Sequence, residues 1–320
     1  MATPIVSVGI PTYNRSVYLI RAIESALRQT YQNIEVIVSD NASSDDTKAR
    51  VLELSDHRIV FVQQPRNLGM IGNFNACLQA ATGDLFLMLS DDDLLEPNAI
   101  ERLSQPFLAE IDSPDISSVG VVWCPVKVLD NLALEKYTTA PGPPREPGWA
   151  LAEGLFRGTR GPRFCSVMVR RTDALAVGGY RDEHGPICDV GNWTQIACTY
   201  PVAICVPEPL AGYTVHQEST TASEPNGVLW QRSGERVTAD LVALLNQRGE
   251  LRAARQIHSA GAANISNLLA TVMMQYMGKP GWIRFWLSEA VRAPRYLFAP
   301  VVFKRLFRDG WKLLRLRPRT

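Results

Sequence analysis

The feature that most constrains the fold is an apolar run that ends in three consecutive aspartates. Residues 85–89 form the run, Gly83 precedes it, and the acids are Asp91, Asp92 and Asp93. Five apolar residues between a glycine and a polar turn are typical of a buried strand in a parallel sheet, although periodicity leaves a short helix open. Open α/β sheets bind ligands beyond the carboxyl ends of their strands, so we expect a ligand site at the acids.

The three acids also suggest a cation. Adjacent carboxylates repel one another, which costs free energy unless water, a cation or hydrogen-bond donors compensate. Their oxygens suit Mg²⁺ or Mn²⁺, which can bridge protein carboxylates to the phosphates of a nucleotide. The competing interpretation is an acidic turn before a helix that has Pro97 in its first turn, and three aspartates alone favour that turn.

Strand-like and helix-like segments alternate through the first hundred residues. Strands are expected at 5–10, 33–40, 58–63 and 85–89, with helices at 17–29, after 46 and at 74–81. This order predicts right-handed parallel crossovers and a doubly wound nucleotide-binding sheet. The polar segments that follow the strands, 11–15, 40–45, 66–73 and 90–93, should share one edge.

The second part of the chain reads less clearly. Further strands are expected at 119–128, 164–169, 203–206 and 210–216, with a short helix at 172–176. Residues 131–163 are rich in Pro, Gly and Arg, and we expect a mobile flap there. A catalytic domain is expected over 1–221.

Residues 222–320 are expected to form a helical extension. Its last part mixes aromatic residues with arginines, as an interfacial membrane-binding surface does. A helical appendage that packs on the domain, with a solvated basic face, is an equal alternative.

Composition narrows the possible partners and compartment. The chain has 320 residues, and 33 Lys and Arg balance 32 Asp and Glu, so global charge does not point to nucleic acid. Six cysteines show no zinc spacing and are interpreted as reduced core residues. Without a signal-like leader or a long apolar span, the expected place is the cytoplasm, with peripheral contact at the inner face of the membrane left open.

Six motifs in order resemble the inverting glycosyltransferases of family 2, which have the GT-A fold. The resemblance covers residues 4–219. The motifs are SVGIPTYNR, VIVSDNASSDDT, NLGMIGNFN, GDLFLMLSDDDLLEPN, RRTDALAVGGYRDE, and CDVGNWTQIA followed by YTVHQES. The resemblance implies a Rossmann-like, mostly parallel central sheet flanked by helices, followed by the helical extension.

The resemblance implies a nucleotide site after the first three strands. Asp40 would accept the imide N–H of uracil or thymine, although an acidic helix-start turn is its alternative. The remaining residues implied at this site are Pro11, Thr12, Tyr13, Arg15, Asn67, Asn73 and Asp91. Tyr13 could instead pack, and the asparagines could serve turns.

The resemblance also implies a metal site and a catalytic base. Asp92 would bind Mn²⁺ or Mg²⁺, with Asp93 as the competitor, and His216 would lie near the metal or pack in the core. Asp189 would be the base, although Cys188 replaces the first acid of the family's pair. A base at the acceptor hydroxyl and a metal at the leaving diphosphate give one inverting displacement.

The implied activity is metal-dependent transfer of a hexosyl or deoxyhexosyl group to a glycan or lipid-linked acceptor, as in cell-surface polysaccharide synthesis. The donor would be a UDP or dTDP sugar before a GDP sugar. A degenerate scaffold or binding subunit is the alternative. Glu183 and His184 are expected to contact the acceptor.

Overall fold

The computed structural model describes residues 3–111, 118–130, 133–216, 227–276, 282–292 and 294–297, together with residues 299 and 302. Its centre is an eight-stranded sheet in the order β3-β2-β1-β4-β10-β6-β11-β9. The strands are β1 (Val6–Thr12), β2 (Ile34–Asp40), β3 (Ile59–Gln63), β4 (Leu85–Met88), β6 (Val119–Trp123), β9 (Arg145–Pro147), β10 (Val167–Arg170) and β11 (Val202–Cys205). β3, β2, β1 and β4 are parallel, as are β6 and β11, whereas β10 and β9 are antiparallel to their neighbours. The α/β class and the mostly parallel sheet are confirmed.

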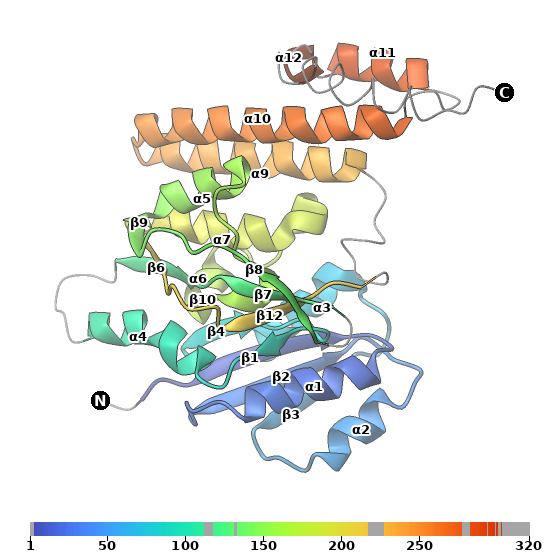
Figure 1. The fold of residues 1–320 in the computed structure, drawn as a ribbon, viewed down its shortest axis with the longest axis vertical. Helices are drawn as coiled ribbons and strands as arrows, with labels where there is room; N and C mark the ends of the chain where they lie inside the picture. The colour runs from blue at the N-terminus through green and yellow to red at the C-terminus, as the bar shows by residue number, and fades with distance from the viewer. Residues whose placement is uncertain are drawn as a thin grey trace.

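Helices cover both faces of this sheet (Figure 1). The helices of this part are α1 (Ser16–Leu27), α2 (Thr47–Glu53), α3 (Gly69–Ala80), α4 (Ala99–Ile111), α5 (Gly148–Arg157), α6 (Arg171–Ala176) and α7 (Cys188–Thr199), with 3-10 turns η1 (Phe164–Ser166) and η2 (Asp182–Ile187). One core joins the sheet to α1 and α4, and a second joins its other face to α3 and α7. The inner strands β1, β4 and β6 are therefore buried on both faces, which explains why they read as continuous apolar runs.

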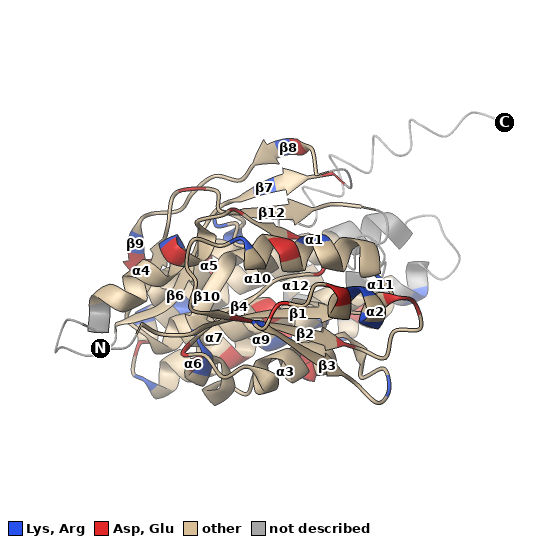
Figure 2. Cartoon of the chain, turned by 90° about the horizontal axis from the view of Figure 1, so that it is seen from below, with Lys and Arg blue, Asp and Glu red and all other residues tan. Residues whose placement is uncertain are grey.

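A smaller sheet extends the first core. It has the order β5-β12-β7-β8, with β5 (Leu94–Leu95), β7 (Val126–Leu129), β8 (Glu135–Thr138) and β12 (Ala211–Thr214). In Figure 2, β7, β8 and β12 lie apart from the strands of the large sheet. Because β5 follows the three aspartates directly, this sheet closes over the carboxyl end of β4.

Three expectations about local structure are wrong. The strand expected at 119–128 is two strands in different sheets, β6 and β7, because the chain leaves the large sheet after Trp123. Residues 131–163 are no structureless flap, since they contribute β8, β9 and α5. β1 continues through Pro11, which lies opposite Ser39 in the parallel pairing with β2.

The helical extension packs on the catalytic part rather than standing apart. α9 (Gly227–Gln247) and α10 (Leu251–Tyr276) form a hairpin above α5 and α7 in Figure 1. Its buried Val237, Leu241 and Ile257 share a core with Ala152 of α5 and Cys198 of α7. The expected boundary near 221 lies outside the described residues.

Two further helices, α11 (Trp282–Arg292) and α12 (Pro294–Leu297), follow the hairpin. Tyr296 is buried and Trp286 is partly buried, and both pack with Ile265 and Leu269 of α10. The packing of these two aromatic side chains agrees with the alternative of a helical appendage packed on the domain. Most of the basic tail after residue 301 lies outside the described residues. In the described ranges no helix has both the length and the apolar character that a membrane crossing requires.

Candidate active site

The polar ends of β1, β2 and β4 meet at one edge of the large sheet, as expected. At the end of β1, the Thr12 hydroxyl donates to Oδ2 of Asp91 at 2.8 Å. The buried amide of Asn73, on α3, donates to the carbonyls of Thr12 and Ser39 at 3.4 and 3.0 Å. Asn73 therefore fixes the spacing of the β1 and β2 ends, and its donor atoms are used within the protein.

Asp91 and Asp92 both pair with the guanidinium of Arg15, the residue just before α1. An Nη1 atom of Arg15 lies 3.4 Å from Oδ1 of Asp91 and 3.1 Å from Oδ2 of Asp92. Burial, and after it the charge of Asp92, raises the pKa of Asp91 to about 7. A cation bound beside these acids would favour their ionised form.

His216 is the third group at this point. Its Nε2 lies 2.8 Å from Oδ2 of Asp92, and the ring stacks on Tyr18 of α1 with 5.2 Å between centroids. The structure therefore brings the predicted residues Asp91, Asp92 and His216 together. Tyr18 was not singled out in the sequence, because an aromatic residue on an amphipathic helix gives no separate signal.

Asp93 has different surroundings. It is completely buried, and its Oδ1 accepts the backbone N–H of Thr214 at 2.8 Å. Burial, with the nearby charge of Asp92, raises the pKa of Asp93 well above the ordinary range. Among the described residues, its Oδ2 has no hydrogen-bond partner. The Asp93 side chain thus links the acidic turn to β12. Asp92 is the acid that contacts both Arg15 and His216.

The expected base-binding side lies at the end of β2. Asp40 is completely buried, and it accepts the Ser43 N–H at 2.9 Å and the Gln63 amide at 3.4 Å. Asn67 lies farther out, where its Oδ1 accepts from the amide of Asn41 at 3.0 Å. A nucleobase that hydrogen-bonds to Asp40 would have to replace the contact of Asp40 with Ser43 or with Gln63.

Pro11, Thr12, Tyr13 and Arg15 differ in how accessible they are. Pro11 and Thr12 are buried in β1, and Arg15 is partly exposed beside the acids. Tyr13 is 46% exposed, so its ring offers a face to a ligand at this edge.

Asp189 occupies the first turn of α7, as the sequence predicted. It is partly exposed, and its Oδ1 accepts the Val190 N–H at 2.8 Å. Burial raises its pKa to about 6, against the opposing effects of hydrogen bonding and of the Arg163 charge. Phe164, Tyr180 and Trp193 pack nearby as an aromatic cluster. A carboxylate with this pKa can accept a proton near neutral pH.

Arg163 lies near both Asp189 and β12. Its guanidinium lies 5.7 Å from the centre of the Tyr213 ring on β12, and the next residue, Thr214, holds Asp93. Arg163 also acts electrostatically on Asp189. Arg163 thus lies near the expected base and near the small-sheet strand whose Thr214 amide bonds to Asp93. Arg163 was not singled out in the sequence, because it lies in the segment that we interpreted as a flap.

The donor set suits a divalent cation in part. Asp92 contributes carboxylate oxygen and His216 an imidazole nitrogen, and Mn²⁺ accepts both ligand types. Within the described ranges, no group of three or more His, Cys, Asp and Glu side chains surrounds one position. Phosphate oxygens of a bound nucleotide would have to complete the coordination.

The expectation that His184 contacts an acceptor is wrong. Its side chain is completely buried against α9, where Nε2 lies 3.0 Å from Oδ2 of Asp240. Glu183 lies beside it, hydrogen-bonded to Arg181. The sequence suggested an acceptor contact because this polar loop lies near Asp189 in the chain. It did not show that α9 covers the loop.

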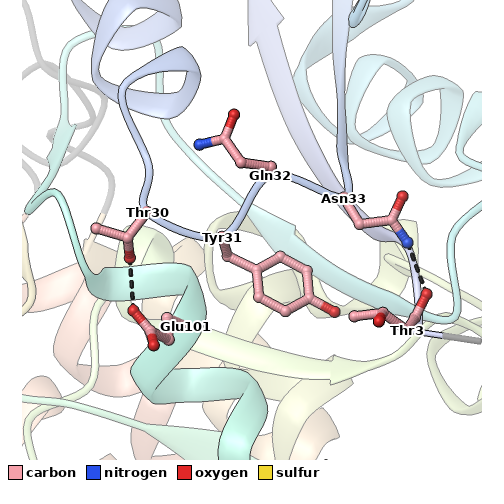
Figure 3. Close-up of a pocket in the computed structure, with 6 residues that line it drawn as sticks. All are labelled: Thr3, Thr30, Tyr31, Gln32, Asn33 and Glu101. Carbon is pink, nitrogen blue, oxygen red and sulfur yellow. Dashed lines mark hydrogen bonds between the residues drawn. The ribbon is translucent and has the colours of Figure 1, made fainter.

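A pocket opens at the opposite edge of the sheet (Figure 3). Thr30, Gln32 and Asn33 border it on the loop that precedes β2, and Glu101 of α4 accepts the Thr30 hydroxyl at 2.6 Å. The Tyr31 hydroxyl donates to the Pro4 carbonyl at 2.6 Å. This pocket contains none of the residues expected to react, so the candidate site is the carboxyl edge.

Comparison with known proteins finds similarity to glycosyltransferases. Residues 7–131 match the model of "Glycosyl transferase family 2". An uncharacterized glycosyltransferase of Rickettsia typhi is 34% identical over 43% of this chain and 42% of its own length. A GalNAc(5)-diNAcBac-PP-undecaprenol beta-1,3-glucosyltransferase of Campylobacter jejuni is 44% identical over 32% of this chain and 34% of its own. The matches thus span less than half of these relatives.

Solved structures resemble the chain over most of its length. TarS 1-349 of S. aureus, in complex with UDP-GlcNAc, has a TM-score of 0.61 at 17% identity and covers 95% of this chain and 92% of its own. The mannosyltransferase PcManGT of Pyrobaculum calidifontis, in complex with GDP-Man and Mn²⁺, has a TM-score of 0.54 at 19% identity and covers 98% and 88%. At this identity the likeness establishes the fold.

Proposed function

We propose that the chain, whose residues 7–131 match glycosyl transferase family 2, moves a sugar from a nucleotide diphosphate to a hydroxyl group of a lipid-linked or cell-surface glycan. The observation that carries the proposal is the meeting of Arg15, Asp92 and His216 at the edge where β1 and β4 end. An edge with a guanidinium, a carboxylate and an imidazole suits a metal-bound diphosphate.

In this proposal Asp92 and His216 hold Mn²⁺ or Mg²⁺. The metal would neutralise the charge that grows on the leaving diphosphate, and Asp93 supports the turn from behind. Arg15, which lies 3.1 Å from Asp92, would contact a phosphate oxygen of the bound diphosphate. Tyr13 and Asp40 would contact the nucleobase, with Pro11, Thr12, Asn67 and Asn73 shaping that side and Asp91 beneath the ribose.

Asp189 would accept the proton of the acceptor hydroxyl while that oxygen attacks the anomeric carbon. The bond to the diphosphate breaks on the opposite side, so the configuration at that carbon inverts. The raised pKa of Asp189 makes the carboxylate a stronger base than an exposed aspartate. Arg163, which lies on the same side, balances the carboxylate charge before the acceptor arrives.

The donor and acceptor are proposed from the relatives and neighbours. TarS is described with UDP-GlcNAc, and the Campylobacter jejuni relative is named for a diphosphate-undecaprenol glycan. We therefore propose a UDP or dTDP sugar before a GDP sugar. A polyprenyl-diphosphate glycan is the proposed acceptor, with a cytoplasmic reaction at the inner face of the membrane.

A donor screen tests the proposal. UDP, dTDP and GDP are compared by thermal shift with and without Mn²⁺, and the matching sugar nucleotides are then incubated with polyprenyl-diphosphate-linked saccharides. We expect one nucleotide to stabilise the protein in a metal-dependent way and its sugar to appear on an acceptor. A scaffold function would instead give nucleotide binding without turnover on any acceptor, identical in the wild type and in Asp189→Asn.

The basic tail gives a second test, for the proposed membrane contact. Lys304, Arg305 and Arg308 are replaced together by glutamine in the full chain, which removes charge without shortening the protein. We expect weaker sedimentation with anionic phosphatidylglycerol vesicles and unchanged nucleotide affinity. Equal sedimentation of both proteins would contradict the membrane contact.

A further inference from the structure

The turn that leads into α7 is held from outside the catalytic part by the hairpin helix α9. His184, in η2, is completely buried, and its Nε2 lies 3.0 Å from Oδ2 of Asp240 on α9. The opposite side of the His184 ring lies against α7, because a Cβ atom on Gly191 would lie 2.2 Å from Nδ1 of His184. The imidazole is therefore wedged between α9 and the first turn of α7.

A network of charges surrounds this wedge. Oδ2 of Asp240 lies 3.2 Å from Nη1 of Arg181, and its Oδ1 lies 3.2 Å from Nε of Arg236. Glu183 is paired with Arg181 and lies 3.7 Å from Nη2 of Arg236. Asp240 thus binds two partners on the η2 side, His184 and Arg181. Loss of its charge would weaken both contacts, while Arg181 would keep its pair with Glu183.

A second close approach lies one residue after His184. Gly185 has a φ of +51°, and a Cβ atom there would lie 2.6 Å from Oγ of Ser233 on α9. Only glycine fits both this conformation and this distance. Asp189 lies in the chain between Gly185, which touches α9, and Gly191, which touches His184. The segment that carries Asp189 is thereby fixed at both ends.

We propose that His184 and Asp240 are positioning residues, through which the α9–α10 hairpin holds Asp189 at the reacting hydroxyl. This inference rests on the proposed function, since it assigns Asp189 the role of base. A displacement of about 1 Å at a reacting group can cost roughly a hundredfold in rate, so a base on the first turn of a helix gains from an external brace. The hairpin would then belong to the catalytic unit.

The kinetic test compares Asp240→Asn with Glu235→Gln. Glu235 is on the same helix and bonds to Arg292 at 2.9 Å, away from η2, so it matches the loss of one charge. For Asp240→Asn we expect kcat about tenfold or more below wild type, with the donor dissociation constant unchanged. The acidic limb of the kcat profile should move to lower pH, because a loosened α7 turn admits water to Asp189.

The His184 variants sharpen this test. His184→Gln keeps a donor for Asp240, so it should retain more of kcat than His184→Ala does. A merely structural role would lower the melting temperature and the amount of active protein without moving the pH limb. An unchanged kcat and pH limb in Asp240→Asn, or an equal change in Glu235→Gln, would overturn the proposal.

A measurement that needs no activity separates this inference from the proposed function. Amide hydrogen exchange is compared between the full-length wild type and Asp240→Asn. We expect faster exchange over residues 186–194 in Asp240→Asn and unchanged exchange in β1 and β4. Unchanged exchange over 186–194 would overturn the positioning proposal. A wild type that transfers no sugar, with faster exchange still seen in the variant, would instead count against the proposed function.

Discussion

Oδ2 of Asp92 lies 2.8 Å from Nε2 of His216, although 124 residues separate them in the chain. Asp92 follows β4 of the large sheet, and His216 follows β12 of the small one. The contact therefore forms only when both sheets are assembled, with the Asp93 side chain joined to the Thr214 amide beside it. The acidic turn is a tertiary site, and a local helix cap would not bring in His216.

His216→Ala is expected to weaken nucleotide binding about tenfold in Mn²⁺ and to leave metal-free binding unchanged, because the imidazole would act through the cation. Calorimetric titration of the preferred nucleotide with and without Mn²⁺ measures both affinities. His258→Ala, an exposed site on α10, is the matched control. Equal weakening with and without metal would speak against a ligand role for His216.

The pH dependence of transfer follows from the environment of Asp189. Burial raises its pKa to about 6, and a base must be ionised before it can accept a proton. We therefore expect kcat/KM to rise through about pH 6 and then to level off. Initial rates between pH 4.5 and 8.5 at saturating Mn²⁺ measure this limb. A flat profile down to pH 5 would exclude Asp189 as the group that limits the rate.

Asp189→Asn should abolish transfer and stabilise the fold. The pKa of Asp189 is raised from an ordinary 3.8, so its contribution to stability is greatest with the carboxyl protonated and is lost as the pH rises through about 6. Because asparagine carries no charge, Asp189→Asn should raise the free energy of unfolding at pH 8 by roughly 1–2 kcal/mol for this partly exposed group. Denaturant unfolding at pH 8 and pH 5 tests this, since the gain should shrink at pH 5. A variant less stable than wild type at pH 8 would contradict it.

Thr12 is expected to matter for stability more than for recognition. Its hydroxyl donates to Oδ2 of buried Asp91 at 2.8 Å, so Thr12→Val leaves that oxygen without this donor and should cost roughly 1–3 kcal/mol. Thr12→Ser keeps the hydroxyl and provides the control. Urea unfolding of the three proteins measures the difference, and a valine variant as stable as the serine variant would show that Asp91 does not need this donor.

The sequence predicted the first half of the fold well, because β1, β2 and β4 are largely buried and β1 to β4 appear as separate apolar runs. It failed after Trp123, where one apolar stretch serves two sheets, since a run of apolar residues does not reveal which sheet it joins. The segment 131–163 was read as a flap because Pro and Gly mask the short strands β8 and β9.

The candidate site was predictable where a side chain follows a strand or begins a helix. The positions of Asp92, after a strand, and of Asp189, in the first turn of a helix, were predicted in this way, whereas their roles come from the family resemblance. Arg163 and Tyr18 were not predicted, because their place depends on contacts with β12 and with His216. His184 was misplaced for a related reason, since its burial comes from α9, a helix that begins more than forty residues later.

The most direct test of the account is the affinity of the preferred nucleoside diphosphate for wild type and Asp92→Asn, titrated with and without Mn²⁺. Asp84→Asn, an exposed site at the other end of β4, is the control. The account predicts that Mn²⁺ tightens binding about tenfold or more in wild type and in Asp84→Asn, and that this gain is lost in Asp92→Asn. An Asp92→Asn protein that keeps the full Mn²⁺ gain would contradict it.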